Sequence, residues 1–150
     1  MVYDFLVKDL KLHLSQKSIG TDKGLAKIGD SIVNLTYSVA KSIYMTKMSS
    51  NKVVIRTGTK VSKTILSDAL RQSDMKSFSK SRADAHDLAD TVEAIIAFVW
   101  LNNNITIQQM IELLEKSFQG NLNNRKEEIE NAKVAFSELL NNIKQYLPRS

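Results

Sequence analysis

Apolar side chains recur three and four positions apart along most of the chain, which is the spacing of one helix face. Proline, which interrupts helices, occurs only at Pro148. These features predict an all-α fold. We expect helices over residues 2–15, 25–45 and 60–73, a long apolar helix ending at 101, and helices over 106–118 and 122–147. Between them, the stretch "KVVIRT" in the connection 48–60 predicts a brief extended piece.

The last two predicted helices carry recognisable end signals. Thr106 followed by Gln109 fits a capping box, and Gly120 fits a C-terminal stop. The final helix has an apolar stripe made of Ile129, Ala132, Phe136, Leu139, Ile143 and Tyr146. This stripe is shorter than three heptads, so we expect it to pack on the protein's own core rather than in a coiled coil.

The composition, with 43% hydrophobic and 25% charged residues, is that of a folded globular protein. A length of 150 residues suits one domain, so we expect a single domain over 1–150, with its core at about 20–118 and a C-terminal helix at about 122–147. No apolar run reaches the roughly 18 residues of a membrane span, and the N-terminus is too charged for a signal peptide. We therefore expect a cytoplasmic protein without a membrane partner.

Cysteine and histidine usage narrows the possible chemistry. The chain has no cysteine, which excludes disulfides, thiolate metal sites and a cysteine nucleophile. Its two histidines, His13 and His86, are far apart in sequence, so a histidine-rich metal site is not expected. A metal ion bound here must be held mainly by oxygen.

Basic residues concentrate in the middle of the chain. Residues 46–82 hold nine Lys and Arg against two Asp, a net +7, whereas the whole chain carries +5. A basic face of this kind can bind a polyanion such as nucleic acid, although runs of charge are more often only solvated surface.

Two acids interrupt the most apolar stretch, "DLADTVEAIIAFVW" at 87–100. An unpartnered carboxylate in a core costs several kcal/mol, so Asp90 and Glu93 need an explanation. Each helical residue turns about 100°, which places these two acids roughly 60° apart on one face. The small residues Ala94 and Ala97 on that side allow another helix to come close.

A third acid shows the same anomaly in "GLAKIGDSIVNLTYSVA" at 24–40. Asp30 has Ala26, Val33 and Tyr37 as its neighbours on the helix face, so we expect it to point inward. Gly29 lacks a side chain, which suits a close approach by another backbone or a ligand.

If the two helices cross at Gly29 and Ala94, three carboxylates meet in one pocket. They repel one another unless a cation neutralises them, and Mg²⁺ prefers oxygen ligands. Such a site suits phosphodiester hydrolysis. The alternative is that each acid caps a neighbouring helix or pairs with a lysine.

The segments "LAKIGDSIV" and "LADTVEAIIAFVWL", about sixty residues apart, resemble the paired signature helices of the ribonuclease III family. The stretch "KVSKTILSDAL" resembles the helix between them, so the likeness covers about residues 20–118. The resemblance implies an all-helical endonuclease domain, a symmetric homodimer, Mg²⁺ (or Mn²⁺) held by carboxylates, and cleavage of both strands of double-stranded RNA.

Position by position, the family's metal-site acids fall on Asp30, Asp90 and Glu93. The resemblance implies that Glu93 and Asp30 are direct metal ligands and that Asp90 supports them or binds through a water. One departure matters: four residues before Asp30 the family usually has a glutamate, and here that residue is Ala26. Alanine at this position resembles the compact Mini-III branch, which lacks a separate RNA-binding domain. His86 could partly compensate, although a surface or capping role is favoured for it.

Without a separate RNA-binding domain, affinity has to come from phosphate contacts made by this domain. We expect Arg56, Lys60, Lys63, Lys80 and Arg82 to supply them. Two other functions stay open. The protein could be a catalytically inactive member that binds structured RNA or an RNA-processing assembly, or a helical adaptor that uses the stripe of residues 129–146.

Overall fold

Helices build the whole fold in the computed structural model, which describes residues 3–150. No β-strand occurs in these residues, so the all-α prediction is confirmed. The helices are η1 (Asp4–Val7), α1 (Lys8–Lys11), α2 (Gln16–Gly20), α3 (Lys23–Met48), α4 (Lys63–Gln72), η2 (Lys76–Phe78), α5 (Ala85–Leu101), α6 (Ile107–Lys116), α7 (Arg125–Ile143) and η3 (Lys144–Tyr146). None of these is long and apolar enough to cross a membrane.

Local sequence signals account for most helix ends. The hydroxyl of Thr106 accepts from the Gln109 amide and the Gln109 side chain accepts from the Thr106 amide, which confirms the predicted capping box of α6. Asp84 and Asp87 form a second capping box at α5. Gly120 has φ +71°, a left-handed conformation that favours glycine. It does not stop α6, which ends at Lys116 with Ser117 as its C-cap residue, so that part of the prediction is wrong.

The N-terminal segment differs from its prediction. Instead of one helix over 2–15 it forms two short helices, η1 and α1, and residue 2 lies outside the described part of the chain. We expected the apolar residues Phe5, Leu6, Leu10 and Leu14 to share one face of that helix, but Phe5, Leu6 and Leu14 are exposed and Leu10 is half-buried. A helix that does not bury a continuous apolar face gains little stability from additional turns, so it stays short.

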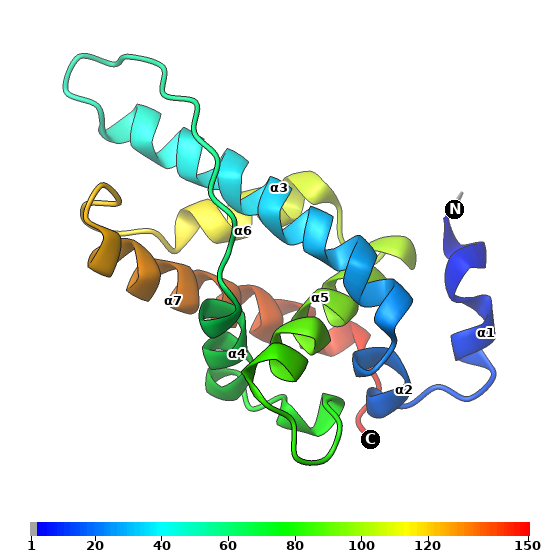
Figure 1. Ribbon diagram of the computed structural model, residues 1–150. Helices are drawn as coiled ribbons and strands as arrows, with labels where there is room; N and C mark the ends of the chain where they lie inside the picture. The colour runs from blue at the N-terminus through cyan, green and yellow to red at the C-terminus, as the bar shows by residue number, and fades with distance from the viewer. Residues whose placement is uncertain (1–2) are drawn as a thin grey trace.

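Helix α5 forms the centre of the core and is buried along nearly its whole length (Figure 1). Helix α3 crosses it on one side, and α4 and α7 lie on another. The C-terminal stripe packs on this core as expected, since Ala132, Phe136, Leu139 and Ile143 are buried. Tyr146, the last residue of that stripe, is exposed.

The crossing of α3 and α5 depends on Gly29. A Cβ atom at this position would lie 1.8 Å from the backbone carbonyl oxygen of Glu93. The two backbones are therefore in direct contact, as the sequence predicted. The residue opposite Gly29 is Glu93 itself, rather than Ala94.

After α3 the chain turns and runs back along the same helix to α4, and we call residues 53–61 the strap (Figure 1). Alternate strap amides bond to α3 side chains spaced four residues apart. The acceptors for the amides of Ile55, Thr57, Thr59 and Val61 are the side-chain oxygens of Thr46, Ser42, Ser38 and Asn34, at 2.8, 2.9, 3.1 and 2.8 Å. The predicted extended piece is therefore not a β-strand, because its partners are helix side chains rather than a second backbone.

A buried ionic cluster joins α3, α7 and the strap. The Lys41 ammonium lies 2.8 Å from a Glu128 carboxylate oxygen and also donates to the Thr59 hydroxyl. Tyr37 and Arg125 donate to the same carboxylate. Burial alone would raise the pKa of Glu128, but the hydrogen bonds from Lys41, Tyr37 and Arg125 outweigh it and lower that pKa. Glu128 is thus held ionised inside the protein.

Candidate active site

The three predicted acids line one pocket between α3, α5 and the strap. Asp30 comes from α3, and Asp90 and Glu93 come from α5. The pocket has a volume of about 480 Å³, and its other lining residues are Lys23, Ala26, Lys27, Lys60, Val61, Lys63 and Leu66. Four lysines and three carboxylates therefore share this space.

Glu93 is the buried member of the set, with 9% of its surface exposed. Burial raises the pKa of its carboxyl group to about 8, helped by a hydrogen bond with Asp30 and by the charges of Asp30 and Asp90, while Lys63 opposes the rise. Within residues 3–150, neither Glu93 nor Asp30 forms an ion pair. The charge of these two carboxyl groups is therefore not neutralised by a cation at ion-pair distance within the described chain.

Asp30 lies at the mouth of the pocket and is exposed, so the prediction that it points into the core is wrong. Its neighbours on the helix face, Ala26, Val33 and Tyr37, are buried. Asp30 itself borders the open space of the pocket. An exposed carboxylate beside a buried one is open to a ligand from solvent.

Asp90 is paired with a cation. Its carboxylate lies 3.2 Å from the Lys23 ammonium and 3.5 Å from Nε2 of His86, and Lys63 contacts Nδ1 of that histidine. The alternative of pairing with a lysine therefore applies to Asp90. His86 is mostly exposed, in line with the surface role favoured for it.

Ala26 is buried and lines the pocket, so the position of the usual family glutamate holds only a methyl group. No three His, Asp or Glu side chains in the described chain are placed to hold a metal ion together. The donor chemistry that fits a cation is the Asp30 and Glu93 pair. Mg²⁺ commonly takes one or two carboxylates and keeps its remaining waters.

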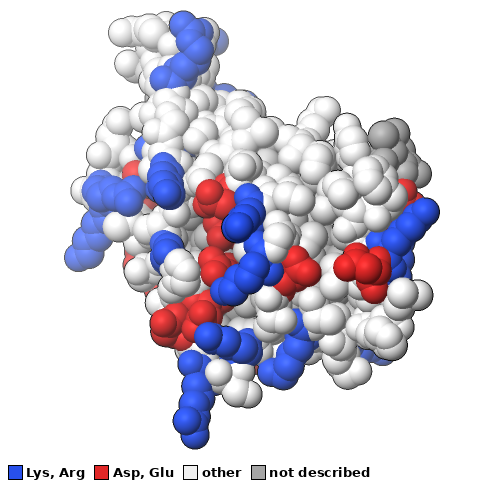
Figure 2. Space-filling view, turned by 45° about the vertical axis from the view of Figure 1, so that its right-hand side comes forward, with Lys and Arg blue, Asp and Glu red and all other residues white. Residues whose placement is uncertain are grey.

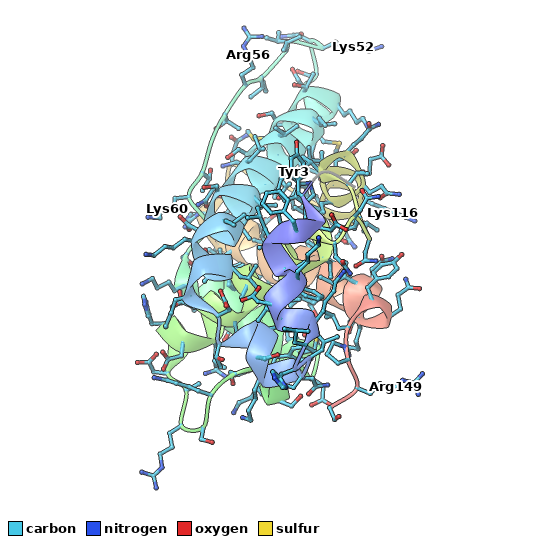
Figure 3. All side chains as sticks on the ribbon, turned by 90° about the vertical axis from the view of Figure 1, so that its right-hand side faces the viewer. Tyr3, Lys52, Arg56, Lys60, Lys116 and Arg149 are labelled. Carbon is cyan, nitrogen blue, oxygen red and sulfur yellow. The ribbon has the colours of Figure 1, made fainter. Side chains whose placement is uncertain are left out.

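The predicted phosphate-binding residues fall into two groups. Lys60 and Lys63 line the acidic pocket. Arg56 lies near the far end of the strap in Figure 3, Arg82 is exposed in a loop, and Lys80 lies 3.4 Å from Asp87. Figure 2 shows acidic side chains gathered on one face, with basic side chains on several sides of them.

Sequence reasoning missed two lysines of the pocket, Lys23 and Lys27. A signal for them existed. They precede Asp30 by seven and three residues, spacings that put all three side chains on one helix face.

Comparison with known protein families gave a match. A family model described as Ribonuclease III matches residues 23–148. The match starts at the first residue of α3 and continues through α7, whereas the resemblance seen in the sequence ended at about residue 118. No curated protein matched the chain. Because the family model covers most of the sequence, the chain belongs to the ribonuclease III family.

Proposed function

We propose that the protein is a metal-dependent endoribonuclease that hydrolyses phosphodiester bonds in double-stranded or structured RNA. Membership of the ribonuclease III family supports a ribonuclease or RNA-binding function. The observation that carries the proposal further is the Asp30 and Glu93 pair. It has no cationic partner in the described chain, and it lies in a pocket lined by four lysines.

In this proposal Asp30 and Glu93 hold one Mg²⁺ or Mn²⁺ ion. A bound ion of this kind supplies an activated water and stabilises the charge that develops on phosphate. Because the pKa of Glu93 is about 8, its carboxyl group has to lose a proton before it can bind a cation at neutral pH. Asp90, paired with Lys23, keeps that lysine at the pocket edge where a phosphate would lie.

The lysines supply the affinity for RNA. Double-stranded RNA is bound mainly through phosphates and 2′-hydroxyls, so lysines around the pocket suffice without base-reading residues. Lys60 and Lys63 line the pocket together with Lys23 and Lys27. In this proposal Arg56, Lys80 and Arg82 extend the RNA-binding surface. We further propose a symmetric homodimer, because two active sites facing opposite strands cut a duplex with a fixed stagger.

A catalytically inactive RNA-binding protein is the second candidate. Ala26 favours it, since one acidic group of the usual family pattern is absent. The ion pair of Asp90 with Lys23 also favours it, because it occupies one of the three acids. The proposed placement within the Mini-III branch explains Ala26 without loss of activity.

Incubation of the pure protein with a labelled RNA duplex distinguishes the two candidates. We expect cutting with Mg²⁺, none with EDTA, and none by Asp30→Asn or Glu93→Gln. The matched control is Glu138→Gln, which removes an exposed carboxylate of α7 and should cut like the parent. Duplex binding without cutting by the parent supports the inactive protein, and neither binding nor cutting contradicts both candidates.

A further inference from the structure

Asn34 differs from the other three α3 residues that hold the strap. Ser38, Ser42 and Thr46 bond to strap backbone atoms, and Ser42 also donates to the Ser38 carbonyl of its own helix. Asn34 also bonds to the strap but reaches Asp30 at the same time. Of the four α3 residues that bond to the strap, Asn34 is thus the one that, within the described chain, also contacts a carboxylate of the pocket.

The orientation of the Asn34 amide follows from its partners. Its Oδ1 accepts from the Val61 amide at 2.8 Å. A backbone N–H can only donate, so the oxygen of the side chain has to face the strap. The NH₂ group therefore faces Asp30 and donates to its backbone carbonyl at 2.9 Å and to its carboxylate Oδ1 at 3.3 Å.

This geometry restrains the Asp30 side chain. Asp30 is exposed, and an exposed aspartate has several rotamers open to it. Asn34 donates to one of its carboxylate oxygens and so favours one of these orientations. The restrained carboxylate lies at the pocket that Glu93, Lys60 and Val61 also line.

We propose that Asn34 is a positioning residue, which orients Asp30 for the cation and fixes the strap end that carries Lys60 beside it. The inference rests on the proposed function, because it gives Asp30 a cation to bind. Groups that orient metal ligands typically change metal affinity or activity by about 10- to 100-fold when they are removed. The Asn34 amide thereby fixes the position of the RNA-binding Lys60 relative to the metal-binding Asp30 carboxylate.

The test compares Asn34→Ala with Ser42→Ala. Both lose a strap bond, but only the Asn34 variant loses the contact to Asp30. We expect Asn34→Ala to lower kcat on an RNA duplex and to weaken Mn²⁺ binding to the RNA-free protein, each by about tenfold or more. Ser42→Ala should raise KM for the duplex while kcat and Mn²⁺ affinity stay within about twofold of the parent.

Asn34→Asp guards against a variant that fails to fold. It keeps an oxygen for the Val61 amide and removes the donor to Asp30, so kcat should fall while KM stays near that of the parent. Equal effects of Asn34→Ala and Ser42→Ala on all three quantities would show that Asn34 only holds the strap. If the parent binds Mn²⁺ and cuts RNA and the Asn34→Asp variant matches it in both, the inference about Asn34 is wrong and the proposed function stands. A parent that does neither overturns the proposed function and the inference with it.

Discussion

The backbone of Gly29 touches the backbone of Glu93: a Cβ atom on residue 29 would lie 1.8 Å from the Glu93 carbonyl oxygen. This contact joins α3 to α5 beside the acidic pocket. Asp30 follows Gly29 directly, and Glu93 carries the other carboxyl group. The closeness of two backbones therefore sets the spacing of the two acids.

Gly29→Ala should destabilise the fold by about 3 kcal/mol or more, because neither backbone can move away without separating the helices. Chemical denaturation measures this. Gly24→Ala is the matched control in the same helix, where the nearest atom to a new Cβ is the flexible Asp22 side chain at 3.3 Å. We expect the control to be neutral or slightly stabilising. Equal effects of the two substitutions would contradict close contact at Gly29.

The raised pKa of Glu93 predicts how stability depends on pH. The carboxyl group changes from an ordinary pKa of 4.5 to about 8 on folding. Between these values the folded state binds a proton that the unfolded chain has released, so the free energy of unfolding falls as pH rises through this window. Each pKa unit corresponds to about 1.4 kcal/mol. Glu93→Gln removes the effect, so its stability relative to the parent should increase from pH 5 to pH 8.5 in metal-free buffer.

Mg²⁺ should reverse that loss of stability. A cation that binds only the folded protein raises its melting temperature, and protons compete with it for Glu93. We expect Mg²⁺ to raise the Tm of the parent more at pH 8 than at pH 5.5, and to have little effect on Glu93→Gln. A Tm rise that is the same for both proteins at both pH values would place the cation elsewhere.

The ionic cluster in the core predicts a stability effect away from the site. Lys41→Met removes the cation 2.8 Å from the buried Glu128 and leaves Arg125 as its charged partner. We expect a loss of about 3 kcal/mol, the lower end of the range for a broken buried pair. Adding Glu128→Gln to that variant should recover part of the loss, because no buried charge remains unpaired. Urea denaturation of both variants measures the difference, and additive losses would contradict direct coupling of the pair.

Removal of pocket lysines should weaken RNA binding in a salt-dependent way. Lys60→Ala or Lys63→Ala should lower duplex affinity and reduce the slope of log K against log salt by about 1 for each lost phosphate contact. Lys116→Ala is the control, because Figure 3 shows Lys116 and Lys60 on opposite sides of the molecule. Electrophoretic mobility shifts of the duplex at several salt concentrations measure the difference between the pocket-lysine variants and the Lys116→Ala control.

Much of the fold follows from local sequence. The capping box at Thr106 and the apolar stripe of α7 depend on residues near one another in the chain, so their pattern predicts them. The approach at Gly29 was also predictable, because a glycine beside an acid in an apolar helix leaves room for a backbone.

Features set by distant segments could not be predicted. Helical periodicity gives the face on which Asp30 lies but not whether another element covers that face, and no element among residues 3–150 buries Asp30. Lys23 and Asp90 pair across 67 positions of sequence. Asn34, Ser38, Ser42 and Thr46 are ordinary polar residues of a helix until the strap returns to bond with them.

Single-turnover cleavage of an RNA duplex across a range of Mg²⁺ concentrations tests the central claim most directly, which is that Asp30 and Glu93 together hold a catalytic cation. The account predicts a parent rate that saturates with Mg²⁺ and a normal curve for Glu138→Gln. Because loss of a group that only orients a ligand costs about 10- to 100-fold, loss of the ligand itself in Glu93→Gln should lower the rate by roughly a hundredfold or more at every Mg²⁺ concentration. A Glu93→Gln curve that coincides with that of the parent would contradict it.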